Sequence, residues 1–231
     1  MPPKGKKKDA ATKPAAAQPE LPPPNWPAFK PLIPPSDLSL QEVVPEQIVT
    51  LPNFWPSSLC KTYVSFLSSL PLTTTPGKPK KGDAVRVNDR FQIQDPLFAK
   101  RLWEETALKD VVLGNVDSED GLRMTEAERK ALWGGEVVGL NPNIRIYRYS
   151  KGQFFDQHCK QPRCIGGETV FYPDPLKKAS KRDPPPDPIE VGLEVGMALL
   201  HKHGADCMLH EGREVLAGEK WVIRSDLCVR R

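Results

Sequence analysis

The sequence predicts an α+β domain in which helices come first and antiparallel strands follow. Two observations support this class: apolar residues recur at helical spacing up to about residue 140, and short segments alternate between apolar and polar residues from Asn141 onward. A third is composition, since 26 prolines and 16 glycines among 231 residues favour short strands joined by turns. We therefore expect a helical part over residues 39–140 and a strand-rich part over residues 141–231.

Residues 1–38 are expected to form a disordered tail. Proline, alanine and lysine dominate this stretch, which offers too little apolar surface to offset the entropy lost on ordering. Five lysines and one acid lie in Met1–Lys13, so much of the formal net charge of +4 sits there and the remaining chain is close to neutral. The KGKKK cluster could be a nuclear address or simply a solvated tail, and the neutral body gives no clear case for binding nucleic acid.

The remaining bulk features indicate an intracellular protein, cytoplasmic or nuclear, with one domain over residues 39–231. The N-terminus lacks the apolar stretch of a signal peptide, and no run approaches the roughly 18–20 apolar residues of a membrane span. Five scattered cysteines, without an export signal, favour reduced thiols. The oligomeric state is left open by the sequence.

The helical part is expected to become ordered near Gln47, with a short strand at Ile48–Leu51. Three helices should follow, opened by Pro56-Ser57, by Pro96, and by Thr125 with its capping-box partner Glu128. The expected buried residues are Leu59, Tyr63, Phe66, Leu67 and Leu70 in the first helix, and Leu97, Phe98, Leu102 and Trp103 in the second.

The strand-rich part begins with Ile144–Tyr149, where the isoleucines face one side and Arg145, Tyr147 and Tyr149 face the other. Apolar runs bounded by glycine, proline and charged residues predict the further strands. They are Thr169–Tyr172, Met197–His201, Cys207–His210 and Lys220–Leu227.

All four histidines lie in this strand-rich half. His158 follows the turn in YSKGQFFDQH, His210 ends a short apolar strand, and Lys220 opens another strand ten residues later. Imidazoles suit Fe(II), two histidines with one carboxylate leave positions open on the metal, and a buried cation can hold a dicarboxylate. The set indicates an iron centre with an anionic co-substrate.

Three motifs here resemble the catalytic core of the iron(II)- and 2-oxoglutarate-dependent dioxygenases, and within them the prolyl 4-hydroxylases. They are RIYRYSKGQFFDQH, GGETVFYPD and HEGREVLAGEKWVIRSD, within about residues 141–227. The segment RVNDRFQIQDPLFAKRLW fits the helical and substrate-side region ahead of them; in it Arg86 and Arg90 are candidate substrate contacts, with surface ion pairing as the alternative role. The resemblance implies a double-stranded β-helix, or jelly roll, over residues 141–231.

The resemblance also implies roles for single residues. His158 and His210 would bind Fe(II), Lys220 would pair with the distal carboxylate of 2-oxoglutarate, and Tyr149 would line that pocket. The implied activity is hydroxylation of a C–H by O2 with decarboxylation of 2-oxoglutarate, and L-ascorbate would act as the reductant. The implied partner is a protein or peptide substrate, with peptidyl proline as the family expectation.

Two features depart from the family pattern. Where the family has an aspartate two residues after the proximal histidine, this chain has Lys160, whose ammonium has no lone pair for a metal. Asp156, two residues before His158, is the nearest candidate substitute because i and i−2 share a face of an extended segment. Only residues 159–165 separate His158 from the Gly-Gly pair, which is too short for the loop and strand expected there. We infer an internal deletion, an incomplete jelly roll, weak iron binding and little turnover.

Two alternatives stay open. One is a degenerate jelly roll that binds a protein or peptide without catalysis, which iron content and 2-oxoglutarate consumption would distinguish from an enzyme. The other is structural zinc, whose ligand types would be available in Cys159, Cys164, His201 and His203, although the C-x4-C spacing is loose.

Overall fold

The computed structural model describes residues 22–75, 87–115, 124–153, 164–173, 186–204 and 207–230. Every strand pair within these ranges is antiparallel, and helices occur only before residue 134, which confirms the predicted α+β class. The expected order of helices first and strands afterwards is wrong, because five strands precede residue 141 and two of them precede the first α-helix. The helical segments are η1 (Pro35–Asp37), α1 (Ser57–Leu67), α2 (Pro96–Glu104), α3 (Leu108–Leu113) and α4 (Glu126–Trp133). The strands are β1 (Gln41–Val44), β2 (Ile48–Leu51), β3 (Thr73–Thr74), β4 (Asp89–Gln94), β5 (Glu136–Leu140), β6 (Asn143–Tyr149), β7 (Ile165–Gly166), β8 (Thr169–Tyr172), β9 (Ile189–Val191), β10 (Ala198–His201), β11 (Leu209–Gly212), β12 (Val215–Ala217), β13 (Lys220–Arg224) and β14 (Leu227–Arg230).

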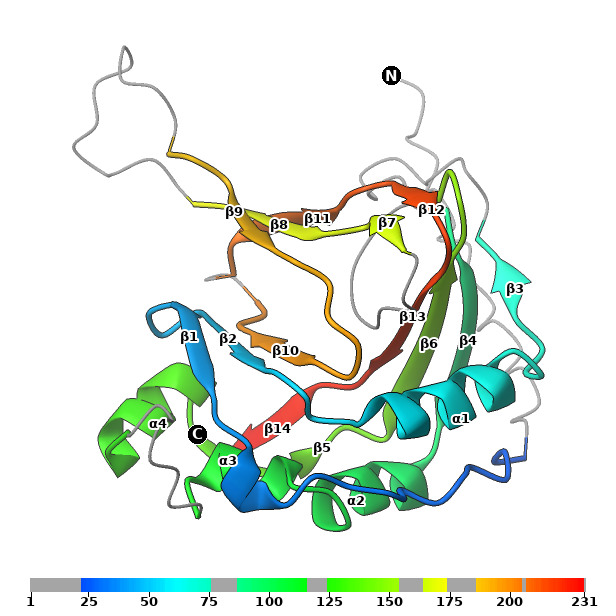
Figure 1. Ribbon diagram of the computed structural model, residues 1–231. Helices are drawn as coiled ribbons and strands as arrows, with labels where there is room; N and C mark the ends of the chain where they lie inside the picture. The colour runs from blue at the N-terminus through cyan, green and yellow to red at the C-terminus, as the bar shows by residue number, and fades with distance from the viewer. Residues whose placement is uncertain are drawn as a thin grey trace, which may run out of the picture.

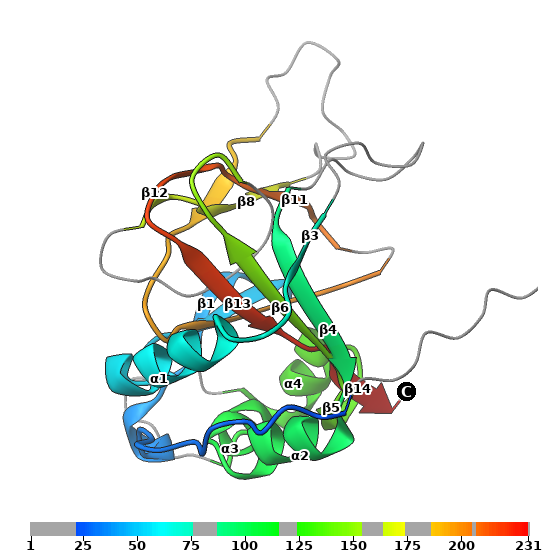
Figure 2. The ribbon, with the colours of Figure 1, turned by 90° about the vertical axis from the view of Figure 1, so that its right-hand side faces the viewer.

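The strands of the described residues form five antiparallel sheets. The longest sheet has the order β13-β6-β4-β3, and its first three strands lie side by side in Figure 2. The groups β11-β8-β9 and β12-β7 lie along the top of Figure 1, and β1-β2-β10 lies below them at mid-height on the left. A further pair, β14-β5, continues beyond β13 toward the helices, which pack against β5 and β6.

The helices begin and end where local chemistry dictates. Asp95 precedes α2, and its carboxylate accepts a hydrogen bond of 2.8 Å from the backbone N–H of Phe98. Thr125 and Glu128 form the predicted capping box of α4, which ends at Gly134 in the left-handed conformation. Among the described residues, no helix combines the length and apolar character needed to cross a bilayer.

The aromatic core corrects the predicted boundary of the tail. Trp26 and Phe29 are 7% and 3% exposed, and the ring of Trp26 stacks on Phe98 of α2 with centroids 3.9 Å apart. Leu38 is likewise buried. Residues 22–38 therefore belong to the packed domain, because their aromatic side chains supply the apolar burial that the surrounding prolines lack; residues 1–21 lie outside the described ranges.

Several predicted elements are confirmed and a few are corrected. The strands Ile48–Leu51 and Thr169–Tyr172 have the predicted bounds, and α1 begins at Ser57 as expected. Leu97, expected in the core, is 67% exposed because its position near the start of α2 points it away from the apolar stripe. The helix α3 was not predicted, and the single strand expected over residues 220–227 is two, β13 and β14, which pair with different partners.

Candidate functional site

Lys220, the first residue of β13, points into the fold. Lys220 is 1% exposed, and its Nζ donates a hydrogen bond of 2.8 Å to the carbonyl oxygen of Gly167, which lies between β7 and β8. The β13–β6 register places Lys220 opposite Tyr149, and Nζ lies 5.5 Å from the centre of that ring. Trp221 packs into the main core on the opposite face, so β13 is buried on both sides here. The structure therefore brings together the two residues that the sequence assigned to the co-substrate pocket.

Tyr149 is held in place from β4. Asn88, immediately before that strand, donates a hydrogen bond of 3.1 Å from Nδ2 to the hydroxyl oxygen of Tyr149, and both residues are 1% exposed. A phenol hydroxyl can accept one hydrogen bond and donate another at the same time. Sequence reasoning missed Asn88, because only the pairing of β4 with β6 brings it to Tyr149 from 61 residues away.

An ion pair lies next to Asn88 on β4. Arg148 donates hydrogen bonds of 3.0 and 2.7 Å from Nε and Nη2 to Oδ2 of Asp89, and Thr74 donates one of 2.6 Å to Oδ1. Burial alone raises the pKa of Asp89, but the hydrogen bonds from Thr74 and Arg148 outweigh it, so the net pKa lies below its ordinary value. The carboxylate therefore stays ionised and fixes β3 and β6 to β4.

His210 lies in β11 beside two further histidines. Its ring centroid is 4.8 Å from that of His201 and 6.2 Å from that of His203, and Phe171 of β8 lies 5.4 Å away. Nδ1 of His210 lies 2.9 Å from the carbonyl oxygen of Met208, a contact in which Nδ1 must donate; in the neutral imidazole the lone pair is then on Nε2. The sequence suggests His201 and His203 only as zinc ligands, because residue spacing alone does not show that they lie beside β11.

Of the two histidines predicted to bind Fe(II), only His210 lies within the described residues. His158, Asp156 and Lys160 lie outside the described residues, as does Cys159 of the zinc alternative. Within the described ranges, no group of three or more histidine, cysteine, aspartate or glutamate side chains could hold a metal ion. His210 therefore has the hydrogen-bond arrangement that suits a metal ligand. The described residues do not contain a complete ligand set for Fe(II).

Arg86 and Arg90 are the two candidate substrate contacts. Arg86 falls outside the described residues. Arg90 lies on β4, partly buried, opposite Tyr147 of β6, and its guanidinium donates a hydrogen bond to the side chain of Gln92. Its contact with a substrate stays a prediction.

No protein-family model and no curated protein sequence matches this chain. Solved structures do match. A prolyl-4-hydroxylase from Pseudomonas putida aligns with 13% identity over 80% of this chain and 94% of its own, with a TM-score of 0.43. HygX from Streptomyces hygroscopicus, solved with nickel and 2-oxoglutarate, aligns with 13% identity over 79% and 83%, with a TM-score of 0.46.

A third match comes from a virus. The collagen prolyl hydroxylase vCPH from Paramecium Bursaria Chlorella virus-1, a 2-oxoglutarate complex, aligns with 11% identity over 80% of this chain and 97% of its own, with a TM-score of 0.40. The three matched structures are thus two prolyl hydroxylases and a protein bound to nickel and 2-oxoglutarate, and each alignment has an identity below 15% and a TM-score below 0.5.

Proposed function

We propose that this chain is an Fe(II)- and 2-oxoglutarate-dependent dioxygenase of the prolyl 4-hydroxylase type, acting on a C–H of a protein or peptide, with peptidyl proline as the substrate class. The observation that carries the proposal is the buried position of Lys220 beside Tyr149. Lys220 and His210 also flank one segment of chain: Lys220 contacts Gly167, and His210 lies opposite Phe171 in the β11–β8 register.

Lys220 would hold the distal carboxylate of 2-oxoglutarate. A carboxylate suits a buried ammonium, because opposite charges attract more strongly away from water and each favours the charged form of the other. Tyr149, whose ring centre lies 5.5 Å from Nζ of Lys220 and whose hydroxyl oxygen accepts from Asn88, would line the same pocket. These three residues come from β13, β6 and the residue before β4, so the central sheet itself would position the co-substrate.

His210 would be one ligand of the metal. Its Nδ1 contact with the Met208 carbonyl orients the ring and leaves Nε2 as the donor atom, which is the usual arrangement of a metal-binding histidine. Fe(II) with 2-oxoglutarate and O2 supplies the oxidation of an unactivated C–H, while the protein supplies binding and orientation. L-Ascorbate would keep the metal reduced.

The turnover of this chain should be low. Lys160 stands where the family has its carboxylate ligand, and an ammonium can neither donate a lone pair nor tolerate a nearby dication. Asp156 is the nearest carboxylate that could replace it. The same substitution favours a second candidate function, a non-catalytic binding module that retains the fold and loses the redox chemistry.

The test is anaerobic titration of the protein with Fe(II) and then 2-oxoglutarate. Chelation of the co-substrate by iron held in a two-histidine, one-carboxylate site should give a visible charge-transfer band, and we expect a weak band with little succinate release in air. His210→Ala should abolish the band, whereas His203→Ala, at an exposed position, should retain it. Succinate release at an ordinary enzymatic rate would contradict the role given to Lys160; absence of both iron and 2-oxoglutarate binding would favour the binding module.

A second measurement isolates Lys220. In calorimetric titrations with 2-oxoglutarate, Lys220→Met should weaken binding by more than about tenfold, which corresponds to about 1.4 kcal/mol. Lys100→Met, which removes an exposed lysine on α2, is the matched control and should leave the affinity unchanged. Equal affinities in both variants would remove Lys220 from the proposed pocket.

A further inference from the structure

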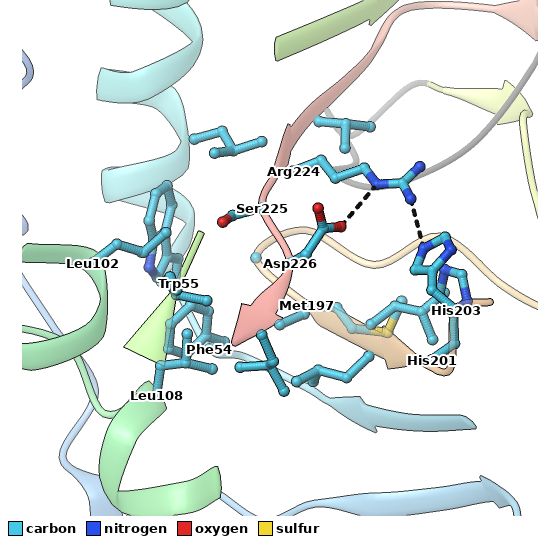
Figure 3. A pocket seen from close by; sticks show the side chains of 18 of the residues that line it. Phe54, Trp55, Leu102, Leu108, Met197, His201, His203, Arg224, Ser225 and Asp226 are labelled. Atoms are coloured by element: carbon cyan, nitrogen blue, oxygen red, sulfur yellow. Dashed lines mark hydrogen bonds and ion pairs between the residues drawn. The ribbon is translucent and has the colours of Figure 1, made fainter. Parts of the chain in front are cut away.

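A large cavity lies between β10 and β13. Its volume is about 710 Å³, which is within the range of roughly 300–1,000 Å³ that small-molecule sites occupy. Figure 3 shows its two ends, an apolar one with Phe54 and Leu102 and a polar one with Arg224 and Asp226. None of the described residues assigned above to the co-substrate or the metal lines it. The cavity is therefore a separate space, large enough for a small organic molecule.

An indole N–H lies at the apolar end, where Trp55 is drawn beside Phe54 in Figure 3. Trp55 is 7% exposed, and its Nε1 has no hydrogen-bond acceptor among the described residues. The ring packs against Tyr63 and Phe29, with centroids 4.6 and 5.5 Å away. The backbone N–H of Trp55 also donates to the carbonyl of Gly196, so the indole is held in place and cannot turn toward another acceptor. A ligand that brought an oxygen to this end would satisfy the buried donor.

At the polar end, two arginines share one carboxylate. Arg224 of β13 lies opposite Arg145 of β6 in the strand register. Oδ2 of Asp226 accepts a hydrogen bond of 2.5 Å from Nη2 of Arg145, whereas Oδ1 is 3.9 Å from Nε of Arg224, too far for a hydrogen bond. Within the described ranges, the guanidinium of Arg224 hydrogen-bonds only the ring of His203. Because a guanidinium has five N–H donors, Arg224 can bind a further acceptor.

The charge at this end is positive. Of the described residues that line the cavity, Lys202 and Arg224 are cations and Asp226 is the only acid. Arg145, bonded to Asp226, adds a third cation, so three positive charges face one negative charge. The side chains of Arg145 and Arg224 are only 18% and 23% exposed, and opposite charges attract more strongly where water is partly excluded. A carboxylate, which matches the planar geometry of a guanidinium, suits this end of the cavity.

We propose that the cavity binds an amphipathic carboxylate that carries an oxygen on its apolar chain. The carboxylate would bind Arg224, the chain would lie along the apolar lining, and a hydroxyl or carbonyl oxygen would accept from Trp55. Apolar contacts supply the affinity in such a site, while a few placed polar groups fix the orientation. The ligand class is thus an oxygenated aliphatic carboxylic acid. This binding site goes beyond the proposed dioxygenase activity and does not depend on it.

The test uses decanoate, its monohydroxylated isomers and decanol as probes. Each is titrated calorimetrically into the full chain without iron or 2-oxoglutarate. Decanoate should bind with one-to-one stoichiometry and about tenfold or more tightly than decanol, because hydrogen bonds to charged groups are the stronger ones. One position of the hydroxyl should bind about twofold to tenfold more tightly than decanoate, the factor that a neutral hydrogen bond contributes. The best position locates the indole along the chain.

Two variants examine the two ends separately. Arg224→Gln should weaken decanoate binding by about tenfold or more and leave decanol unchanged, since only the acid carries the charge. Trp55→Phe should leave decanoate unchanged and abolish the preference for one hydroxyl position. Arg230→Gln, which removes an exposed arginine on β14, is the matched control and should change neither affinity. Melting curves establish that each variant is folded, and the comparison of decanoate with decanol in the native chain needs no variant.

Lys220→Met shows which pocket holds the acid. Lys220 does not line the cavity, so this variant should bind decanoate as the native chain does. Loss of decanoate binding in Lys220→Met but not in Arg224→Gln would place the acid in the co-substrate pocket and overturn the proposal. Equal affinities for decanoate and decanol, no binding of any probe, or a hydroxyl preference that persists in Trp55→Phe would also overturn it. Failure to bind iron or release succinate would contradict only the proposed function.

Discussion

Trp26 donates a hydrogen bond of 2.8 Å from its indole Nε1 to Oδ2 of Asp95, although 69 residues separate them. Asp95 is 2% exposed and its other oxygen caps helix α2 through the N–H of Phe98. One buried carboxylate therefore starts a helix and ties the N-terminal segment to it.

Replacing Asp95 with alanine should destabilise the protein strongly. The change removes an N-cap, worth about 0.5–2 kcal/mol, and leaves the Trp26 N–H buried without an acceptor, which costs about 1–3 kcal/mol more. Urea unfolding measures the loss. Thr125→Ala, which removes the exposed cap of α4, is the control and should cost only about 1 kcal/mol. Equal losses in the two variants would contradict the double role of Asp95.

The two buried indoles should respond differently to the same substitution. Trp26→Phe deprives the Asp95 carboxylate of a donor, whereas Trp55→Phe removes an N–H that has no acceptor among the described residues. We expect Trp26→Phe to lower the free energy of unfolding by about 1–3 kcal/mol more than Trp55→Phe. The difference is read from paired urea titrations, since both variants lose a similar volume; a larger loss for Trp55→Phe would be the contrary result.

Asp89 should give the protein an acid-dependent stability. Its pKa is depressed in the folded state, so its contribution to the free energy of unfolding is fully present above the unfolded pKa of about 3.9 and is lost as pH falls through the folded value. Asp89→Asn should lack this component. The gap in unfolding free energy between native protein and variant should therefore be constant from pH 7 to 5 and shrink below about pH 4. Arg148→Met, which removes one of the stabilising donors, should reduce the same pH dependence; a gap that widens toward low pH would reverse the assigned sign.

Gly196 should tolerate no side chain. Its φ is +76°, and a Cβ there would lie 1.8 Å from the carbonyl oxygen of Trp55, whose own N–H donates to the Gly196 carbonyl at 2.9 Å. Gly134 has nearly the same φ, +77°, with no atom within 4 Å of a Cβ. Gly134→Ala should thus cost only the left-handed strain of about 1–2 kcal/mol, while Gly196→Ala adds a backbone clash and should cost at least about 2 kcal/mol more or prevent folding. Thermal melts of the two variants side by side measure this difference.

The sequence alone determined the features that rest on local chemistry. The strand Ile48–Leu51, the Pro-initiated start of α2 and the Thr125–Glu128 capping box are all written in short patterns, because the groups that make them are within a few residues of each other. The resemblance to 2-oxoglutarate oxygenases came from motifs as well, including the glycine pair that contains Gly167 and the strand that Lys220 begins.

Only the tertiary structure decided how distant residues meet. Asn88 reaches Tyr149 because β4 pairs with β6, and His201 and His203 lie beside His210 because β10 and β11 follow one another around the fold. The domain starts before residue 38, because the stacking of Trp26 on Phe98 offsets the entropy cost of ordering this proline-rich segment. Composition alone predicts that this cost keeps the segment disordered.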